Sequence, residues 1–234
     1  MKQLRKDDIS VIIPALNEEE PIADVVRGCL ATGLPREVIV VDNGSTDRTA
    51  ERAREAGARV VEAPRGYGNA CAAGVRALSP DCEIVVFLDG DGSDCPELMK
   101  RLVQPILDGT HDFVIGSRTR GERERGSMNA QQVFAGYFAG WLIRPLYGVK
   151  YTDMCPFRAI RRPALEKLAM KEPTYGWNLE MQMRAARARL RIFEVPVNHR
   201  CRTGGESKVS GTMRGTFIAG TRILATFLRV AAGR

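Results

Sequence analysis

The chain has 234 residues, of which 44% are hydrophobic and 27% are charged, and its formal net charge is +7 at pH 7. These fractions are ordinary for a soluble globular protein, and the length suffices for one large domain or two small ones. No stretch approaches the ~20 uninterrupted apolar residues of a membrane-spanning helix. Because the only histidines are His111 and His199, a histidine-rich metal site is excluded and a Ser-His-Asp hydrolase is disfavoured.

The six cysteines are scattered along the chain without a C-x-x-C pair. This spacing indicates neither a zinc site nor a disulfide framework, so we expect reduced thiols. The first eight residues lack the apolar core of a signal peptide, and we therefore expect a cytoplasmic protein. Arginines are concentrated at positions 118–125 and after position 184. Such basic surfaces attract nucleic acid, anionic membranes or phosphorylated substrates.

The first half of the chain alternates short apolar segments with segments of helical periodicity. The apolar segments predict strands at Ser10–Pro14, Glu37–Asp42, Ala58–Glu62, Glu83–Leu88 and Asp112–Gly116. The periodic segments predict helices at 18–31, 46–56, 68–78 and 96–108. This alternation is typical of βαβ units, so we expect an α/β fold with a mostly parallel sheet flanked by helices.

The alternation stops after residue 117. A charged loop at 118–129 precedes an aromatic, apolar stretch at 133–147, and then a helix near 176–189 and a strand near 191–199 are predicted. We expect one domain over residues 1–210. Residues 211–234 form a predicted amphipathic, basic helix that either belongs to the same domain or contacts a membrane or a second copy of the chain.

The most informative segment is the apolar run Ile84–Leu88, which leads directly into Asp89-Gly90-Asp91. Such a run indicates a strand buried on both faces, and open α/β sheets bind ligands at the carboxyl ends of their strands. Paired carboxylates there suit Mg²⁺ or Mn²⁺, which completes its coordination with water and substrate phosphate oxygens. The alternative is a solvated turn, since Asp-Gly is also a common turn pair.

Other polar residues follow the neighbouring strands and are expected at the same edge of the sheet. Asp42 ends the second strand, where an acidic side chain is placed to accept hydrogen bonds from a ribose or a base. The loop at 65–70 carries two glycines before a helix, which suits close approach of the backbone to a nucleotide. It lacks the third glycine of G-x-G-x-x-G, so a dinucleotide-binding fold is only weakly supported.

In this order, the motifs resemble those of family 2 glycosyltransferases of the GT-A type, and within them the dolichyl- or polyprenyl-phosphate sugar synthases. The resemblance spans about residues 9–210. It is carried by V-I-I-P-A-L-N-E-E at 11–19, V-D-N-G-S-T-D at 41–47, F-L-D-G-D at 87–91, I-G-S-R at 115–118, T-D with P-F-R at 152–158, and R-T-G-G-E-S-K at 202–208. The chain departs from the family pattern at Asn43, at Ser93 and at residues 154–156.

The resemblance implies a role for each matching residue. It places Pro14, Asn17, Glu18 and Asp42 around the nucleoside. Asp89 and Asp91 would bind the metal ion and the diphosphate, Arg118 would lie near the acceptor, and Arg202 with Lys208 would close over phosphates. Forked guanidinium groups and a point-charge ammonium group both suit phosphate oxygens. For Arg118 and Arg202 the alternative is an ordinary solvated surface arginine.

The implied reaction displaces a nucleoside diphosphate from the anomeric carbon of a sugar with inversion, and UDP-glucose is favoured over GDP-mannose as the donor. The catalytic residues expected are Asp91, Asp153 and Arg118. A hydroxyl acceptor would need a general base, for which Asp153 and Glu180 are candidates. A phosphate acceptor is already anionic at neutral pH and would need none. We therefore favour a lipid phosphate acceptor, with Asp153 orienting the acceptor or the metal ion.

A lipid acceptor requires contact with a membrane. The stretch at 133–147 and the basic C-terminal segment could lie in the membrane interface, at the cytoplasmic face. Alternatively, both are packing helices or a contact in a homo-oligomer, and the acceptor is a soluble small molecule. A nucleotidyltransferase is the second enzymatic reading, but its glycine-rich basic loop is replaced here by an acidic one at 15–19. A nucleic-acid-binding module is disfavoured because the basic loop at 118–125 contains no aromatic residue.

Overall fold

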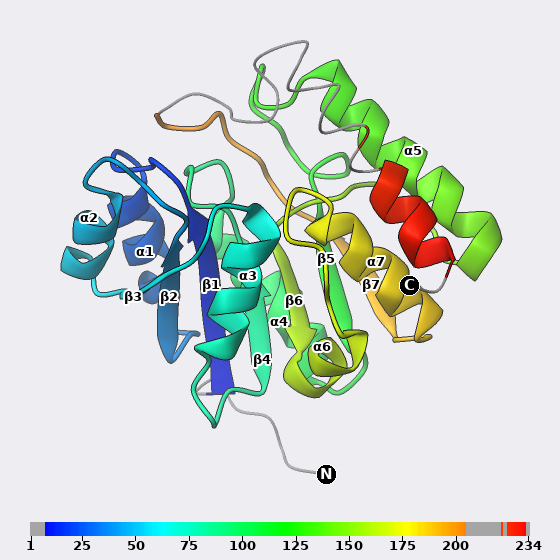
Figure 1. Cartoon of the computed structure of the whole chain (residues 1–234), viewed down its shortest axis with the longest axis horizontal. Helices are drawn as coiled ribbons and strands as arrows, with labels where there is room; N and C mark the ends of the chain where they lie inside the picture. Colours follow the sequence, from blue (N-terminus) through cyan, green and yellow to red (C-terminus); the bar gives the residue numbers. More distant parts are fainter. Residues whose placement is uncertain (1–7, 205–220, 222–223, 233–234) are drawn as a thin grey trace.

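The computed structural model describes residues 8–204, 221 and 224–232. Within them, seven strands form one sheet in the order β3-β2-β1-β4-β6-β5-β7 (Figure 1). The strands are β1 Ile9–Ala15, β2 Glu37–Asp42, β3 Arg59–Glu62, β4 Ile84–Phe87, β5 Phe113–Ser117, β6 Arg158–Arg161 and β7 Ile192–Pro196. Only β6 is antiparallel to its neighbours, β4 and β5, so the predicted mostly parallel sheet is confirmed.

In the described residues, seven α-helices lie between the strands along the chain. They are α1 Ile22–Ala31, α2 Thr49–Glu55, α3 Tyr67–Arg76, α4 Met99–Leu107, α5 Ala130–Tyr147, α6 Arg162–Leu168 and α7 Trp177–Arg187. A 3₁₀ turn at Pro96–Leu98 leads into α4, and a further helix covers 224–231. None of the helices in the described part of the chain is long and apolar enough to span a membrane.

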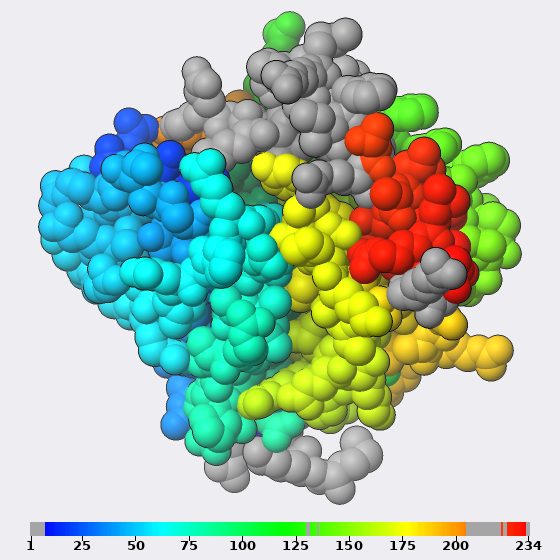
Figure 2. Space-filling view, in the orientation of Figure 1, coloured from blue at the N-terminus to red at the C-terminus, as the bar shows by residue number. Residues whose placement is uncertain are grey.

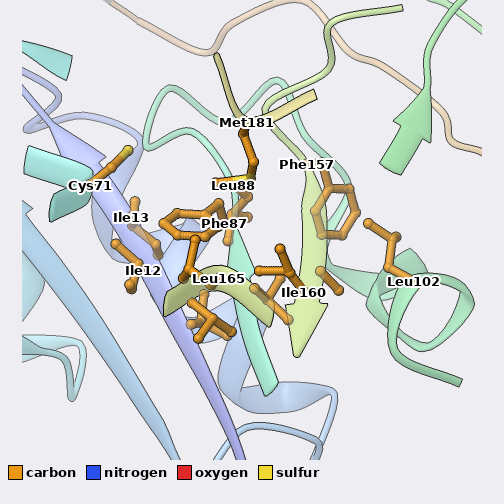
Figure 3. Packing of buried hydrophobic residues seen from close by; sticks show 14 of the residues in the cluster. Ile12, Ile13, Cys71, Phe87, Leu88, Leu102, Phe157, Ile160, Leu165 and Met181 are labelled. Atoms are coloured by element: carbon orange, nitrogen blue, oxygen red, sulfur yellow. The ribbon is translucent and has the colours of Figure 1, made fainter. Parts of the chain in front are cut away.

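The core lies on both faces of the sheet (Figure 3). Side chains alternate along a strand, so Ile12 of β1 faces Gly74 of α3, whereas Ile13 lies on the other face near Ile22 of α1. Buried Phe87, the last residue of β4, continues the same core. This two-sided burial explains why β1, β2 and β4 read as unbroken apolar runs in the sequence.

Three elements differ most from the sequence prediction: α1 begins later than predicted, and β6 and α6 were not predicted. The first helix begins at Ile22 rather than at residue 18, because Asn17 has a positive φ of 53° and the following residues form hydrogen bonds with the loop after β2. Strand β6 was not predicted, because it has four residues and an arginine at each end. Arg158 is nevertheless fully buried and donates to the carbonyl oxygens of Cys155 and Asn178.

The C-terminal region is described only in part. The helix at 224–231 lies beside α7, where an Arg229 guanidinium nitrogen is 3.6 Å from the Glu180 carboxylate (Figure 1). The predicted helix over 211–234 and the predicted boundary at residue 210 fall mostly outside the described residues. The division into 1–210 and 211–234 therefore stays a prediction.

Candidate active site

A pocket of about 630 Å³ opens at the carboxyl edge of the sheet, where β1, β2 and β4 end. We call it the main pocket. Six of the predicted site residues line it, namely Pro14, Glu18, Asp89, Asp91, Arg118 and Arg202. They come from segments up to 188 residues apart in the chain, from Pro14 to Arg202. The parallel arrangement of β1, β2 and β4 is what brings the first of these loops to one edge.

The loop after β4 carries three aspartates. The Tyr67 hydroxyl donates to Asp89 Oδ1 at 3.0 Å, and the Asp89 backbone N–H donates to Asp94 Oδ2 at 3.0 Å. Asp91 Oδ1 accepts hydrogen bonds from the backbone N–H and the hydroxyl of Ser93, at 3.0 and 2.6 Å. These contacts aim the Asp89 and Asp91 carboxylates from the strand end into the main pocket.

This loop holds more negative charge than its surroundings neutralise. Burial raises the pKa of Asp89 well above its usual range, and the charges of Asp91 and Asp94 raise it further. Burial also raises the pKa of Asp94 to about 7, although the backbone N–H of Asp89 acts in the opposite direction. Carboxylates that destabilise one another in this way are a good environment for a divalent cation.

His199 joins this loop from the far end of the chain. It pairs with Asp94 in an isolated β-bridge, it is 5% exposed, and it lines the main pocket. Its Nδ1 lies 3.9 Å from Asp94 Oδ1, and both atoms are buried without a hydrogen-bond partner. Burial, with the charge of Arg118, lowers the pKa of His199 to about 4, so the ring is neutral and Nδ1 is free to bind a cation.

The residues present therefore fit a divalent cation. Asp89, Asp91 and His199 offer oxygen and nitrogen ligands on one side of the main pocket, and two buried polar atoms there lack a partner. No group of three or more ligands is already assembled in metal-binding geometry within the described ranges. Mg²⁺ and Mn²⁺ commonly bind through one or two carboxylates plus substrate phosphates, which matches a partly formed site.

Arg118 is held by Asp153. Its guanidinium donates two parallel hydrogen bonds of 2.8 Å to the two carboxylate oxygens, and its backbone N–H donates a third of 2.9 Å. A fourth bond of 2.7 Å comes from the Met154 backbone N–H. Burial alone would raise the pKa of Asp153, but these hydrogen bonds and the Arg118 charge hold it below its usual value. Arg118 reaches the main pocket, whereas Asp153 lies behind it with 1% of its side chain exposed.

Arg202 is held by Glu18 in a comparable way. Its Nη2 donates to both Glu18 carboxylate oxygens at 2.8 and 3.0 Å, and its Nε donates to the carbonyl oxygen of Gly204 at 2.9 Å. Its Nη1 lies 4.0 Å from Asp91 Oδ2. Arg202 thus stands next to the carboxylate loop. Lys208, the other predicted phosphate ligand, lies outside the described residues.

Two of the predicted nucleoside contacts do not line the main pocket. The Asn17 amide oxygen accepts from the Thr46 backbone N–H, and the Asp42 carboxylate accepts from the Ser45 backbone N–H. The Asn17 bond connects the loops after β1 and β2, whereas the Asp42 bond stays within the loop after β2. Asn43, one residue beyond Asp42, does line the main pocket and accepts from the Gly66 backbone N–H at 2.9 Å.

Glu180, the other base considered from the sequence, also lies away from the main pocket. It is fully buried and accepts hydrogen bonds from the backbone N–H groups of Lys171 and Glu172 and from Arg184. Its carboxylate is occupied in a structural network. No carboxylate proposed as a base is therefore positioned in the main pocket.

Several pocket residues were missed by the sequence reasoning. Tyr67 and Tyr175 contribute aromatic walls, and Asn129 and Gln132 contribute the first turn of α5. The glycine-containing loop before Tyr67 was a local sequence signal that could have indicated Tyr67 as a pocket residue. His199 carried no comparable signal, because its link to Asp94 exists only in the folded chain.

The comparison with known families agrees with this geometry. The family described as Glycosyl transferase family 2 matches residues 10–169. The chain belongs to this family. An uncharacterized glycosyltransferase of Mycobacterium tuberculosis is 39% identical over 217 residues, which cover 91% of this chain and 94% of that protein. A dolichyl-phosphate hexose transferase of Haloferax volcanii is 35% identical over 207 residues, which cover 87% and 88%.

A solved structure supports the fold of this glycosyltransferase. This chain is similar in structure to glucosyl-3-phosphoglycerate synthase from Mycobacterium tuberculosis, solved in complex with Mn²⁺, UDP-glucose and phosphoglyceric acid, with a TM-score of 0.77. The two are 27% identical, and the match covers 97% of this chain and 80% of that chain. The expected GT-A fold and the expected glycosyltransferase activity class are confirmed. The nucleotidyltransferase alternative is set aside.

Proposed function

We propose that this glycosyltransferase moves a hexose from a nucleoside diphosphate sugar, with UDP-glucose favoured over GDP-mannose, to a polyprenyl- or dolichyl-type lipid phosphate with inversion. The observation that carries the donor half is the charge arrangement of the main pocket. The surplus carboxylates of Asp89 and Asp91 face the same space as Arg118 and Arg202. The Mn²⁺ and UDP-glucose in the similar synthase support this assignment.

Asp89 and Asp91, with His199 beside them, would hold Mg²⁺ or Mn²⁺, which when bound supplies positive charge to the departing diphosphate. One of the chain's own cations acts on the same group. Arg202 is fixed by Glu18, so it needs no reorganisation as charge develops on the leaving group. Lys208 remains a proposed further phosphate contact.

The nucleoside side of the pocket is assigned to Pro14, Glu18 and Asn43, which line it. Asn17 and Asp42 then act as positioning residues. The Asn17 side chain connects the loops after β1 and β2, and the Asp42 side chain holds the backbone of the second loop at Ser45. Positioning of this kind matters because small displacements of binding groups cost large factors in rate.

The proposal of a phosphate acceptor rests on the finding that neither carboxylate considered as a general base lines the main pocket. Asp153 accepts four hydrogen bonds and stays ionised, so it is a positioning residue for Arg118 and has no lone pair directed at an acceptor. A phosphate acceptor fits this pocket because its attacking oxygen is already anionic at neutral pH. Arg118 would bind that phosphate through guanidinium N–H groups that it does not donate to Asp153.

The lipid nature of the acceptor is supported by the surface of α5. Phe134, Phe138 and Trp141 stack in sequence with ring centroids 5.7 and 6.0 Å apart, and Phe134 and Trp141 are 68% and 69% exposed. The same helix contributes Gln132 to the main pocket. Residues 126–152 contain no acidic side chain. An exposed aromatic row without acidic neighbours suits the interface of an anionic membrane, so we place the protein at the cytoplasmic membrane face.

A second candidate function is transfer to a soluble phosphorylated acceptor. The observation that favours it is the similar structure, which contains phosphoglyceric acid. Both candidates share the donor, the metal ion and an anionic acceptor, and they differ in what the exposed face of α5 contacts. In the soluble case that face would be covered by a second copy of the chain.

The deciding experiment offers radiolabelled UDP-glucose and Mn²⁺ with either undecaprenyl phosphate or phosphoglyceric acid. We expect label in the organic phase with the lipid and none in the soluble product. The double variant Phe134→Ser, Trp141→Ser should lose sedimentation with anionic vesicles, whereas Phe193→Ser, which removes an exposed aromatic ring from β7, should keep it. Transfer to phosphoglyceric acid alone, or a change from dimer to monomer in the double variant, would favour the second candidate.

A further inference from the structure

The segment between α6 and α7 lies between two elements that are distant in the sequence. In Figure 2 its yellow surface lies between the cyan surface of α3 and the red surface of the helix at 224–231. On the α3 side, the Asn69 backbone N–H donates to the carbonyl oxygen of Pro173 at 3.0 Å. On the other side, the Thr226 hydroxyl donates to Glu172 at 2.9 Å. The segment is therefore a bridge between these helices.

Glu172 is the centre of this bridge. One carboxylate oxygen accepts from Thr226 and from the Arg229 guanidinium at 2.9 and 2.7 Å. The other accepts from the backbone N–H and the hydroxyl of Thr174, at 3.1 and 2.6 Å. The Glu172 backbone N–H donates to Glu180 of α7. The side chain thus ties the C-terminal helix to the backbone turn that leads into α7.

The contact of the bridge with α3 leaves no room for adjustment. A Cβ atom placed on Gly68 would lie 1.9 Å from the carbonyl oxygen of Glu172, and one on Gly66 would lie 2.3 Å from that of Pro173. Backbone therefore packs directly on backbone, with no flexible side chain between them. A displacement of residues 172–173 must be transmitted to the first turn of α3.

The first turn of α3 belongs to the main pocket. Gly66 and Tyr67 line it, and the Tyr67 hydroxyl donates to Asp89 Oδ1 at 3.0 Å. Tyr175, three residues after Glu172, lines the pocket from the bridge itself. The contacts therefore run without a break from Thr226 and Arg229 to the carboxylate loop.

We infer that the helix at 224–231 sets the geometry of the donor pocket and that Glu172 is the positioning residue through which it acts. When the helix is seated, Thr226 and Arg229 fix Glu172, and the bridge holds Tyr67 and Tyr175 in place. When it is displaced, the pocket loses this support. The inference rests on the proposed function in taking the main pocket as the donor site.

A coupling of this kind is reciprocal, so the donor would also favour the seated helix.

Glu37 provides a matched control for Glu172. It is also a mostly buried carboxylate that accepts from a hydroxyl (Ser10, 2.7 Å), a backbone N–H (Ser79, 2.9 Å) and an arginine (Arg59, 2.7 Å). It lies at the first residue of β2, at the opposite edge of the sheet from the main pocket. The variant Glu37→Gln therefore removes a comparable charge without touching the bridge.

The experiment measures hydrogen exchange in the peptide at 66–70 and UDP binding by calorimetry in the presence of Mn²⁺. For Glu172→Gln and for Thr226→Val we expect faster exchange at 66–70 and an affinity for UDP reduced by about fivefold or more. Glu37→Gln should change neither, at a similar loss of melting temperature. The double variant Glu172→Gln, Thr226→Val should lose no more UDP affinity than Glu172→Gln alone, because both changes act through the Glu172 carboxylate.

Unchanged exchange at 66–70 in Glu172→Gln, or an equal loss of affinity in Glu37→Gln, would overturn the inference. A wild-type protein that binds neither UDP nor GDP with Mn²⁺ would instead overturn the proposed donor site. The exchange measurement needs no ligand, so it tests the coupling between the helix and α3 in either case.

Discussion

Asp153 lies behind Arg118 and binds its guanidinium through two parallel hydrogen bonds of 2.8 Å. The carboxylate is 1% exposed and the guanidinium side chain 13% exposed, so both charges are largely removed from water. A buried pair of this kind costs desolvation energy, and the loss of one partner leaves the other charge uncompensated. Asp153 therefore determines where Arg118 points in the main pocket.

We expect Asp153→Asn to lower the free energy of unfolding by about 3–5 kcal/mol, because Arg118 would stay buried without its counter-charge. Urea unfolding followed by circular dichroism measures this. Asp112→Asn is the control, since it removes the partner of an exposed arginine, Arg191, and should have a much smaller effect. Equal losses of unfolding free energy in the two variants would show that burial does not make the Arg118–Asp153 pair more important for stability.

In the folded Asp153→Asn protein, and in Arg118→Lys, transfer should fall while UDP affinity is kept, because Arg118 is assigned to the acceptor. Lysine keeps the charge but cannot form the two parallel bonds with Asp153. An equal fall in UDP affinity would show that Arg118 binds the donor rather than the acceptor. Steady-state kinetics with separate variation of donor and acceptor distinguishes these results.

Removal of Asp91 tests the metal assignment. In the wild type, UDP with Mn²⁺ should raise the melting temperature more than UDP alone, since ligands that bind only the folded state stabilise it. In Asp91→Asn the two conditions should give the same shift. Ser93→Ala removes the hydroxyl hydrogen bond on Asp91 but keeps the backbone bond and the charge, so most of the Mn²⁺ effect should persist. A full Mn²⁺ effect in Asp91→Asn would contradict the assignment.

Glu172 should make stability depend on pH. Burial alone would raise its pKa, but hydrogen bonds from Thr174 and Thr226 and the Arg229 charge hold it below its usual value. Its contribution is therefore present above the unfolded pKa of about 4.3 and is lost as the pH falls through the folded value. The melting temperatures of wild type and Glu172→Gln should differ at neutral pH and converge as the pH falls below the unfolded pKa of about 4.3 and through the lower folded value. A difference that does not change with pH would contradict this account.

Two glycines in helices should respond to alanine with opposite signs. In α3, a Cβ on Gly74 would lie 2.5 Å from Ile12, so Gly74→Ala should lower the free energy of unfolding by about 1–3 kcal/mol. In α1, a Cβ on Gly28 would meet Pro96 at 3.4 Å, so Gly28→Ala should raise it by about 0.5–1 kcal/mol. Chemical denaturation measures both. Stabilisation by Gly74→Ala would mean that α3 is not packed closely on β1.

The predictability of the elements follows from their burial. The β2 strand was predicted with its observed bounds, Glu37–Asp42, because its uninterrupted run of β-branched residues is buried on both faces. The four-residue β6 was missed because Arg158 breaks the apolar pattern, and only its buried carbonyl partners make that residue compatible with the core. Helix α1 was predicted too long, because Asn17 and its neighbours bond to another loop rather than to their own helix.

The α/β class, the family and the carboxylate loop at Asp89-Gly90-Asp91 could be predicted from the sequence, because they depend on contiguous residues whose pattern is local. The folded chain was needed to show that Asp153 supports Arg118, that His199 joins Asp94, and that Glu172 ties the helix at 224–231 to α3. Each of these relationships joins segments separated by 35 residues or more. Such contacts depend on burial and on the order of strands in the sheet, which local periodicity does not encode.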